Sequence, residues 1–337
     1  MEFSRAYTGT SIWGLAHTIA PEIVTSAWID EQLAETYERC DIRPGLLEKV
    51  AGIVERRWWP EDLSFDQVAA MAARDALRDA DVEAADVDML ISTSVCKHHL
   101  EPSVACAVHF GLGLSPTCTN FDLGNACLGF INAMNIAAMA IESGQARTVL
   151  IVDGEGSRHT QLATIERLRQ ASATTSDVFA QFASLTLGSG AAAMVMGGPR
   201  RGSHAFLGGV TRAATQHHEL CVGDLEQMRT DTAMLLTSGL ELVRETYVAA
   251  AAQGWSWDDC DWYVMHQVSA VHTNMICALL DIDLKRVPLT YPFFGNIGPA
   301  AVPYTLSSVA DQLVTGDRVL LMGIGSGLNC AGAELVW

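Results

Sequence analysis

The chain has 337 residues and carries 39 acidic against 21 basic side chains, which gives a formal net charge of −18. Apolar residues make up 49% of the sequence and charged residues 18%, so the chain can bury a large hydrophobic core. Such an acidic chain is not expected to bind nucleic acid or to dock on an anionic membrane. Its length predicts two domains or one large duplicated unit.

The nine cysteines are scattered, and none forms a Cys-x-x-Cys pair. An odd number of isolated cysteines is typical of free thiols in a reducing compartment rather than of a disulfide framework. The N-terminal residues MEFSRAYTGT lack the basic and apolar segments of a signal peptide, and the apolar stretch around 130–141 is too short to span a bilayer. We therefore expect a cytoplasmic protein without an integral membrane segment.

Predicted helices and strands alternate along the first half of the chain. A helix is predicted over 66–79, and a strand covered on both faces over 87–93, where the sequence is a short and nearly continuous apolar run. A further strand at 119–123 precedes an apolar helix over 129–143, which ends at a glycine. Another strand follows at 148–152. This order predicts an α/β fold with a buried sheet.

The second half repeats the landmarks of the first. VDMLISTS, TNFDLGNACLGF and ARTVLIVDGEG in the first half correspond to CDWYVMHQVS, PLTYPFFGNIGPAAVP and DRVLLMGIGSG in the second. Trp262, Gly295 and Val319 follow Met89, Gly124 and Val149 by 170 to 173 residues. We predict an internal duplication with halves at 1–185 and 186–337, against the alternative that all α/β proteins repeat such units. The polar and poorly periodic stretch 157–182 is expected to form a lid-like insertion.

Three chemically active side chains follow strands that a duplication would bring together: Cys127, His266 and Asn296. Cys127 lies at a strand-to-helix turn, where unpaired N–H groups and the helix dipole are expected to lower the thiol pKa and to stabilise the thiolate. With a histidine and an asparagine that donate to a thioester oxygen, such a set is typical of acyl transfer. The alternative is a packing cysteine, a structural histidine and a turn asparagine.

A glycine-rich turn, Gly325-Ser326-Gly327, follows the last predicted strand of the chain. Its backbone could supply an N–H from Gly327 beside that of Cys127, so that the two form an oxyanion hole. No carboxylate spacing indicates a metal site, and no glycine-rich nucleotide-binding loop follows a strand. We expect no permanently bound cofactor.

These motifs resemble the thiolase superfamily and, within it, the ketoacyl synthase III branch. The resemblance is carried by NACL, HQVS, GNIGPA, GIGSGLNC and the stretch GIVERR, which in that branch is associated with coenzyme A binding. Further stretches, among them LEPS, VDGE and GGVTR, resemble the OleA-type enzymes, which condense two acyl-CoAs head to head. The resemblance covers essentially the whole chain. It implies a thiolase fold, with duplicated αβαβα layered halves related by a pseudo-twofold axis.

The resemblance also implies roles for individual residues. Cys127 would be the acylated nucleophile, and His266 and Asn296 would form a second oxyanion hole. Glu101, in LEPS, would be the base that removes an α-proton, and it would reach the active site of the partner subunit in a homodimer. Such a base is needed because two simple acyl-CoAs, unlike a malonyl group, cannot form the carbon nucleophile by losing carbon dioxide.

Two groups of basic residues bear on this assignment. The resemblance implies that arginines hold coenzyme A, and the candidates are Arg56, Arg57 and Arg212. Lys97, His98 and His99 lie just before Glu101 and would lower its pKa if they paired with it.

The implied reaction is a non-decarboxylative Claisen condensation of two long-chain acyl-CoAs through acyl-Cys127, with release of a 2-alkyl-3-keto acid. Enzymes that make an olefin or a β-lactone are the downstream partners that it suggests. The alternatives are a decarboxylative 3-oxoacyl-ACP synthase III, an acyltransferase with the same residues, or a non-catalytic partner subunit. Acyl chain length, the choice between coenzyme A and acyl-carrier protein as donor, and the choice between homodimer and heterodimer are open at this point.

Overall fold

The computed structural model describes residues 5–337. At its centre is a mixed sheet with the strand order β12-β13-β14-β9-β2-β8-β7-β5-β6. In chain order, these strands are β2 (Ser11–Ile19), β5 (Met89–Ser92), β6 (Thr119–Asp122), β7 (Thr148–Glu155), β8 (Gly190–Gly197), β9 (His204–Ala213), β12 (Trp262–Met265), β13 (Arg318–Gly325) and β14 (Asn329–Val336). The short β1 (Arg5–Ala6) pairs with β9.

The strand order is symmetrical about the contact between β2 and β9. On one side β5 pairs in parallel with β7, and β7, β8 and β2 follow in antiparallel order. On the other side β12 pairs in parallel with β13, and β13, β14 and β9 follow in the same way. The register is equivalent too, because Met89 lies opposite Val149 and Trp262 lies opposite Val319. The landmarks of the sequence repeat therefore occupy matching positions, and the predicted duplicated fold is confirmed.

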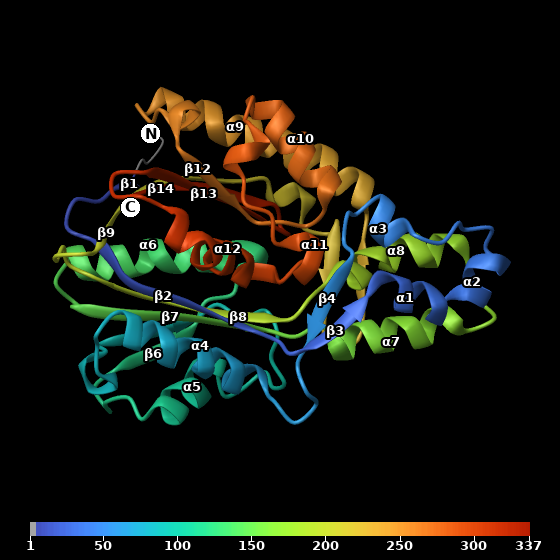
Figure 1. Ribbon diagram of the computed structural model, residues 1–337, viewed down its shortest axis with the longest axis horizontal. Coiled ribbons are helices and arrows are strands. Elements are labelled where there is room, and N and C mark those ends of the chain that lie inside the picture. The colour runs from blue at the N-terminus through green and yellow to red at the C-terminus, as the bar shows by residue number, and fades with distance from the viewer. Residues whose placement is uncertain (1–4) are drawn as a thin grey trace.

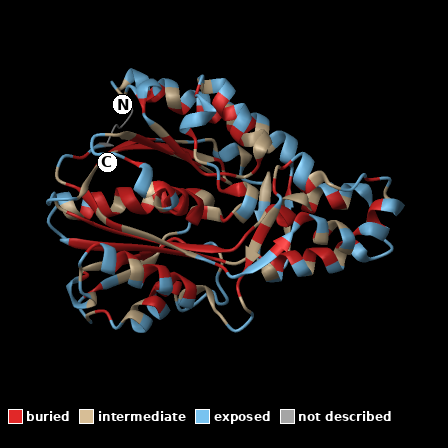
Figure 2. Cartoon of the chain, viewed as in Figure 1, coloured by how far each residue is buried: buried red, intermediate tan, exposed pale blue. Residues whose placement is uncertain are grey.

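Helices form three layers around the two halves of the sheet (Figure 1). The helices α6 (Gly129–Glu142) and α12 (Ala301–Val309) lie between the halves and share one hydrophobic core with both. The helices α4 (Phe65–Asp79) and α5 (Val104–Leu112) cover one outer face, and α9 (Thr232–Ala252) and α10 (Ala270–Leu280) cover the other. Figure 2 shows that the strands and α6 are largely buried.

A lobe of shorter elements lies at one end of the molecule, on the right in Figure 1. It consists of the antiparallel pair β3 (Glu22–Thr25) and β4 (Glu55–Trp58) with the helices α1 (Ser26–Gln32), α2 (Ala34–Arg39), α3 (Leu46–Lys49), α7 (Arg158–Arg169) and α8 (Thr175–Thr186). These elements bury a hydrophobic cluster of their own, which includes Ile29 and Leu168. The predicted insertion 157–182 coincides with α7 and most of α8, two helices that pack in this lobe.

The division of the chain at residues 185 and 186 stays a prediction. The strand β8 begins at Gly190, after that point, but it pairs with β7 and β2 of the N-terminal half. Strand pairing therefore favours a division after Gly197, in the turn that leads to β9.

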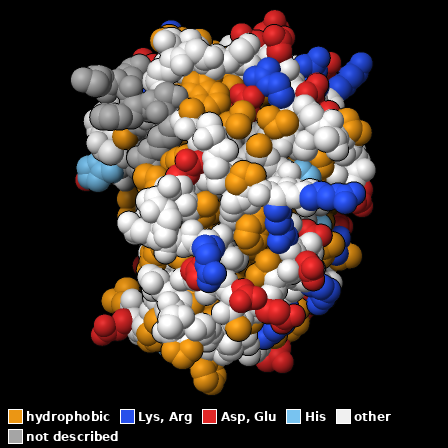
Figure 3. Space-filling model, turned by 90° about the vertical axis from the view of Figure 1, so that its left-hand side faces the viewer, with side chains coloured by type: hydrophobic (Ala, Val, Ile, Leu, Met, Phe, Trp, Pro, Cys, Tyr) orange, Lys and Arg blue, Asp and Glu red, His pale blue; other side chains and the backbone are white. Residues whose placement is uncertain are grey.

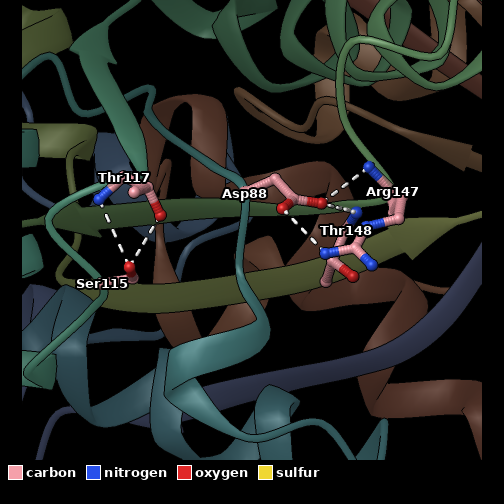
Figure 4. Close-up of polar contacts among 5 residues, drawn as sticks. All are labelled: Asp88, Ser115, Thr117, Arg147 and Thr148. Atoms are coloured by element: carbon pink, nitrogen blue, oxygen red, sulfur yellow. Dashed lines mark hydrogen bonds and ion pairs between the residues drawn. The ribbon is translucent and has the colours of Figure 1, made fainter.

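Polar contacts fix the starting ends of the parallel strands (Figure 4). The carboxylate of Asp88 accepts the backbone N–H groups of Arg147 and Thr148 at 2.8 and 3.1 Å, and Ser115 bonds Thr117 at 2.7 Å in the turn before β6. Although partial burial raises the pKa of Asp88, these bonds to Arg147 and Thr148 lower it below its ordinary value overall. Because the parallel strands start in line, their carboxyl ends lie together at one edge of the sheet.

The left-hand face of the molecule carries acidic and basic side chains among scattered hydrophobic ones (Figure 3). No helix within residues 5–337 is both long enough and apolar enough to cross a membrane.

Candidate active site

A cavity of about 670 Å³ opens beyond the carboxyl ends of β7, β12 and β13. Cys127, His266 and Asn296 all lie in its wall, so the structure brings together the three residues that the sequence singled out. Loops from both duplicated halves line the cavity, as expected for a site at the carboxyl ends of strands. Its remaining lining is largely apolar and includes Leu240 and Ile276.

Cys127 lies in a single 3₁₀ turn, Ala126–Leu128, that leads into α6. Burial raises the pKa of its thiol to about 12, and the nearby Cys221 and Glu155 also disfavour a negative charge. The prediction of a lowered thiol pKa is therefore wrong, because the loss of solvation outweighs the favourable field of the helix N-terminus. The resting nucleophile is a neutral thiol.

His266 directly follows β12, and its backbone N–H donates to Met322 at 2.7 Å. Burial lowers the pKa of the imidazole to about 4, and the neighbouring His272 lowers it further, against a hydrogen bond to the backbone of Gly298. Its Nδ1 is buried and has no hydrogen-bond partner among residues 5–337. The site therefore holds a neutral imidazole.

Asn296 is held rigidly by hydrogen bonds on its backbone and on one side of its amide. Its N–H donates to Thr186 at 2.9 Å, and its C=O accepts from Gly188 at 2.8 Å. The side-chain Oδ1 accepts the N–H of Gly298 at 3.0 Å, which leaves the Nδ2 hydrogens for a ligand in the cavity. The preceding Gly295 has φ +65°, and a Cβ there would lie 2.7 Å from the Thr186 oxygen, so only glycine fits.

The glycine-rich turn approaches the nucleophile loop closely. Gly325 and Ser326 line the cavity, and a Cβ on Gly325 would lie 3.0 Å from the Asn125 oxygen. The Nδ2 of Asn329 donates to the Oδ1 of Asn125 at 3.2 Å and so ties the turn to the loop that carries Cys127. A backbone N–H of Gly327 in the oxyanion hole stays a prediction.

Sequence reasoning missed two acidic residues at the end of β7. Glu155 accepts the N–H groups of Val95 and Cys96 at 2.6 and 3.3 Å and lines the cavity, and Asp153 accepts the hydroxyl of Thr93. Burial raises the pKa of Glu155 to about 7 and that of Asp153 well above its ordinary value. The available signal was a pair of acids at the end of an otherwise apolar strand, VDGE.

Glu101 is exposed in the loop before α5 and does not line the cavity of its own chain. The preceding residues Lys97 to Leu100 do line it. Within residues 5–337, no ion pair joins Glu101 to Lys97, His98 or His99, and the His98 ring instead stacks on Phe65 with centroids 4.3 Å apart. A single chain therefore does not bring Glu101 to Cys127.

The three predicted coenzyme A arginines differ in their surroundings. Arg56 is fully buried and donates to the carbonyl oxygens of Val24 and Leu185 and to the Ser26 hydroxyl. Because its guanidinium is enclosed within the lobe, the structure contradicts its role as a phosphate ligand. Arg57 is one-fifth exposed and pairs with Glu55 at 2.8 Å, and Arg212 pairs with Glu245 at 3.6 Å.

Comparisons with known proteins agree with this geometry. The family model of 3-oxoacyl-[acyl-carrier-protein] synthase III matches residues 121–164, and the model of its C-terminal part matches residues 250–337. The cerulenin-bound structure of Xanthomonas campestris OleA superposes with a TM-score of 0.97 at 44% identity over 98% of each chain. An OleA structure with bound lauric acid and lauroyl-CoA gives a TM-score of 0.96 at 44% identity, over 98% of this chain and 100% of that one.

Relatives of assigned function point the same way. The acyl-CoA:acyl-CoA alkyltransferase of Xanthomonas campestris is 44% identical over 98% of this chain and 99% of its own length, and that of Shewanella oneidensis is 33% identical over 100% of both. The β-ketoacyl-[acyl-carrier-protein] synthase III of Rhodospirillum rubrum is 29% identical over 89% of this chain and 93% of its own length. The fold and the cavity thus define a condensing enzyme of the thiolase superfamily. Within that class, the chain belongs to the OleA family of acyl-CoA:acyl-CoA alkyltransferases.

Proposed function

We propose that this enzyme joins two long-chain acyl-CoAs by a non-decarboxylative Claisen condensation and releases a 2-alkyl-3-keto acid. The observation that carries the proposal is the convergence of Cys127, His266 and Asn296 in one cavity wall of a chain that is 44% identical to an acyl-CoA:acyl-CoA alkyltransferase. A related OleA was solved with lauroyl-CoA, which supports coenzyme A thioesters as the substrates.

In the first step the sulfur of Cys127 attacks the thioester carbonyl of one acyl-CoA. The C–S bond to Cys127 forms, the C–S bond to coenzyme A breaks, and coenzyme A leaves as a thiol. Because burial keeps Cys127 protonated, its proton must leave as the sulfur attacks, and the neutral His266 in the same wall is the base that we assign to this transfer. The backbone N–H groups of Cys127 and Gly327 would stabilise the oxyanion.

In the second step Glu101 removes an α-proton from another acyl-CoA. The enolate oxygen would accept hydrogen bonds from His266 and from the Asn296 amide, whose Nδ2 the Gly298 contact leaves free. The α-carbon attacks the acyl-Cys127 carbonyl, and the Cys127 sulfur leaves and is reprotonated. Water then cleaves the remaining thioester of the β-ketoacyl-CoA, which gives the keto acid and free coenzyme A.

Glu101 fits this role in a homodimer in which it acts on the partner subunit. In solved OleA structures a glutamate and a cysteine that have been substituted lie 26 residues apart, which is also the spacing of Glu101 and Cys127. The strand β6 is the edge of the sheet, and nearby Leu100 and Phe110 are 97% and 88% exposed. An open sheet edge with exposed large apolar side chains favours pairing with a second copy of the chain.

The substitution Glu101→Ala tests the proposed base. We expect condensation of two dodecanoyl-CoA molecules to fall at least about 100-fold, because general base catalysis contributes 10²–10⁴-fold, while acylation of Cys127 continues. Product acid is measured by chromatography, and the acyl adduct by mass spectrometry of the intact protein. Glu83→Ala, at another exposed glutamate, is the control and should change neither signal. Normal condensation by Glu101→Ala would show that the base is a different group.

The alternatives give different outcomes in the same assay. A decarboxylative synthase would release product only when malonyl thioesters are supplied, and a non-catalytic partner subunit would show no acyl adduct on Cys127. Offering acyl-CoA and acyl-carrier-protein thioesters side by side identifies the donor. A mixture of chain lengths identifies the selectivity.

Two further assignments belong to this proposal. Arg57 and Arg212 are the arginines that we assign to the coenzyme A phosphates, since Arg56 is enclosed. All nine cysteines are free thiols, which supports the expected location in the reducing cytoplasm. A keto acid product would pass to an enzyme that forms an olefin or a β-lactone.

A further inference from the structure

One histidine in the cavity wall has no part in the mechanism above. His272 lies in the first turn of α10 and lines the cavity together with Cys127 and His266. Its Nδ1 lies 2.9 Å from the Oγ of Ser269. Its Nε2 is buried and has no hydrogen-bond partner among residues 5–337.

Either atom of the contact with Ser269 can be the donor, and the tautomer in which Nδ1 accepts is the one that gives the buried Nε2 a proton. The Oγ of Ser269, the N-cap of α10, accepts the backbone N–H of His272 at 3.4 Å, so its own hydroxyl hydrogen is free to donate to Nδ1. Burial lowers the pKa of His272, which favours the neutral ring with a single proton. A neutral ring that accepts at Nδ1 carries that proton on Nε2. We assign this tautomer to His272, in which the unpartnered Nε2 is an N–H donor.

A buried donor without a partner is costly, and buried polar groups in folded proteins almost always have one. Val268 and Ile276, which line the cavity on either side of His272 along the chain, offer no acceptor in their side chains. Since no side chain or backbone group of residues 5–337 pairs with this nitrogen, a ligand in the cavity that it lines can supply the acceptor. A neutral donor in largely apolar surroundings suits an uncharged carbonyl oxygen better than a phosphate, which needs positive charge.

We propose that His272 is a substrate-binding residue whose Nε2–H donates to an amide carbonyl of the pantetheine arm of the bound acyl-CoA. This rests on the proposed function, which supplies the acyl-CoA. In the proposed mechanism the two thioester carbonyls that react are assigned other donors, the Cys127 and Gly327 backbone for one and His266 with Asn296 for the other. The amide carbonyls of the arm are the uncharged acceptors that remain next to the reacting sulfur.

Binding measured without turnover tests the assignment. In a Cys127→Ala background, which cannot be acylated, titration calorimetry gives the Kd of dodecanoyl-CoA and of free coenzyme A. We expect His272→Ala to weaken both ligands about 5–10-fold, the effect of one hydrogen bond. His272→Gln, which keeps an N–H donor near the position of Nε2, should stay within about 2-fold of the parent. Ser269→Ala, which removes the side-chain contact to Nδ1, should give Kd values between those of His272→Ala and His272→Gln. His218→Ala, at an exposed histidine that does not line the cavity, is the control and should bind as the parent does.

Steady-state kinetics with Cys127 intact provide the second readout. A contact to a carbonyl that does not react contributes equally to the bound substrate and to the transition state, so His272→Ala should raise KM for acyl-CoA and leave kcat unchanged. Thermal unfolding of each variant checks that the fold is intact.

Three results would overturn the assignment. One is an unchanged Kd in His272→Ala, and another is weaker binding of dodecanoyl-CoA but not of free coenzyme A, which would place the contact at the thioester. The third is a fall in kcat at constant KM. Product formation by the wild-type enzyme is followed in parallel. If it makes no keto acid but the Kd values differ as expected, the proposed function fails and the role of His272 stands.

Discussion

At the scale of single residues, burial sets the protonation of the active-site wall. The pKa of Cys127 rises to about 12, that of His266 falls to about 4 and that of Glu155 rises to about 7, so each shift favours the neutral form. A sequence shows that Cys127 follows a strand and precedes a helix, but it does not show how much water reaches the sulfur. This is why the trio could be identified from its motifs while the direction of the thiol pKa shift could not.

The buried acid of Glu155 makes a prediction about stability and pH. Its pKa in the folded chain, about 7, lies above its ordinary value of 4.5, so between these two values the folded state keeps a proton that the unfolded state has lost. The free energy of unfolding must therefore fall as pH rises through this window. Glu155→Gln removes this titration, and we expect it to reduce the loss of stability between pH 5 and pH 7.5 by about 1–3 kcal/mol. Urea unfolding at the two pH values measures it, with Glu83→Gln as the exposed control. An unchanged slope in Glu155→Gln would show that the carboxyl titrates normally.

At the scale of an element, β4 shows how a motif can mislead when its secondary structure is ignored. GIVERR suggested that Arg56 and Arg57 act together, but successive side chains in a strand point to opposite faces. Arg56 and Trp58 are buried, while Arg57 and Glu55 lie on the other side and are partly exposed. If 55–58 is known to be a strand, the alternation of its buried and exposed side chains follows. This short and charged segment, however, has no alternating apolar residues that would identify it as a strand from the sequence.

Arg56 is therefore expected to be a structural residue of the lobe. It joins β3, through the carbonyl of Val24, to α8, through the carbonyl of Leu185, and burial lowers its pKa to about 10 against a favourable effect of Asp30. Arg56→Ala would leave these buried carbonyls unpaired and should cost about 3–5 kcal/mol, the usual cost of removing one partner from a buried charged network. Urea unfolding measures the loss. Arg57→Ala on the exposed face is the comparison and should cost less than about 1 kcal/mol. Equal costs for the two variants would contradict this assignment.

At the scale of the whole molecule, the duplication was predictable and its assembly was not. The offset of 170 to 173 residues matched Met89 to Trp262 because both begin a parallel strand next to an equivalent neighbour. The secondary structure of such periodic and buried segments can be predicted from their local sequence pattern. The packing of the lobe around Ile29 and Leu168 cannot be predicted in this way, because the lobe brings together helices from distant parts of the chain whose apolar faces meet only in the fold. Likewise, a role for His272 and Glu155 can be inferred only from their place in the cavity wall, which the sequence does not show.

The assembly of whole subunits also determines in which cavity Glu101 acts. Within one chain Glu101 is exposed and lies outside the cavity that holds Cys127. The proposed homodimer predicts that it acts in the partner's cavity. Two inactive variants, Cys127→Ala and Glu101→Ala, should then restore each other when their subunits are mixed. In a mixed dimer the Glu101→Ala subunit has an intact Cys127, and its partner supplies an intact glutamate, so one site of two works. Because random exchange makes half of the dimers mixed, we expect about a quarter of the wild-type condensation rate.

The mixing experiment separates this arrangement from its alternative. If Glu101 served the cavity of its own subunit, no dimer of the two variants would contain a complete site, and the rate would stay at the level of the separate variants. The two variants are co-expressed with different affinity tags, and purification through both tags isolates the mixed dimers. Their expected condensation rate is about half of the wild-type value, because one of two equivalent sites is complete. Mixed dimers that acylate Cys127 but release no keto acid would show that Glu101 does not act across the subunit interface.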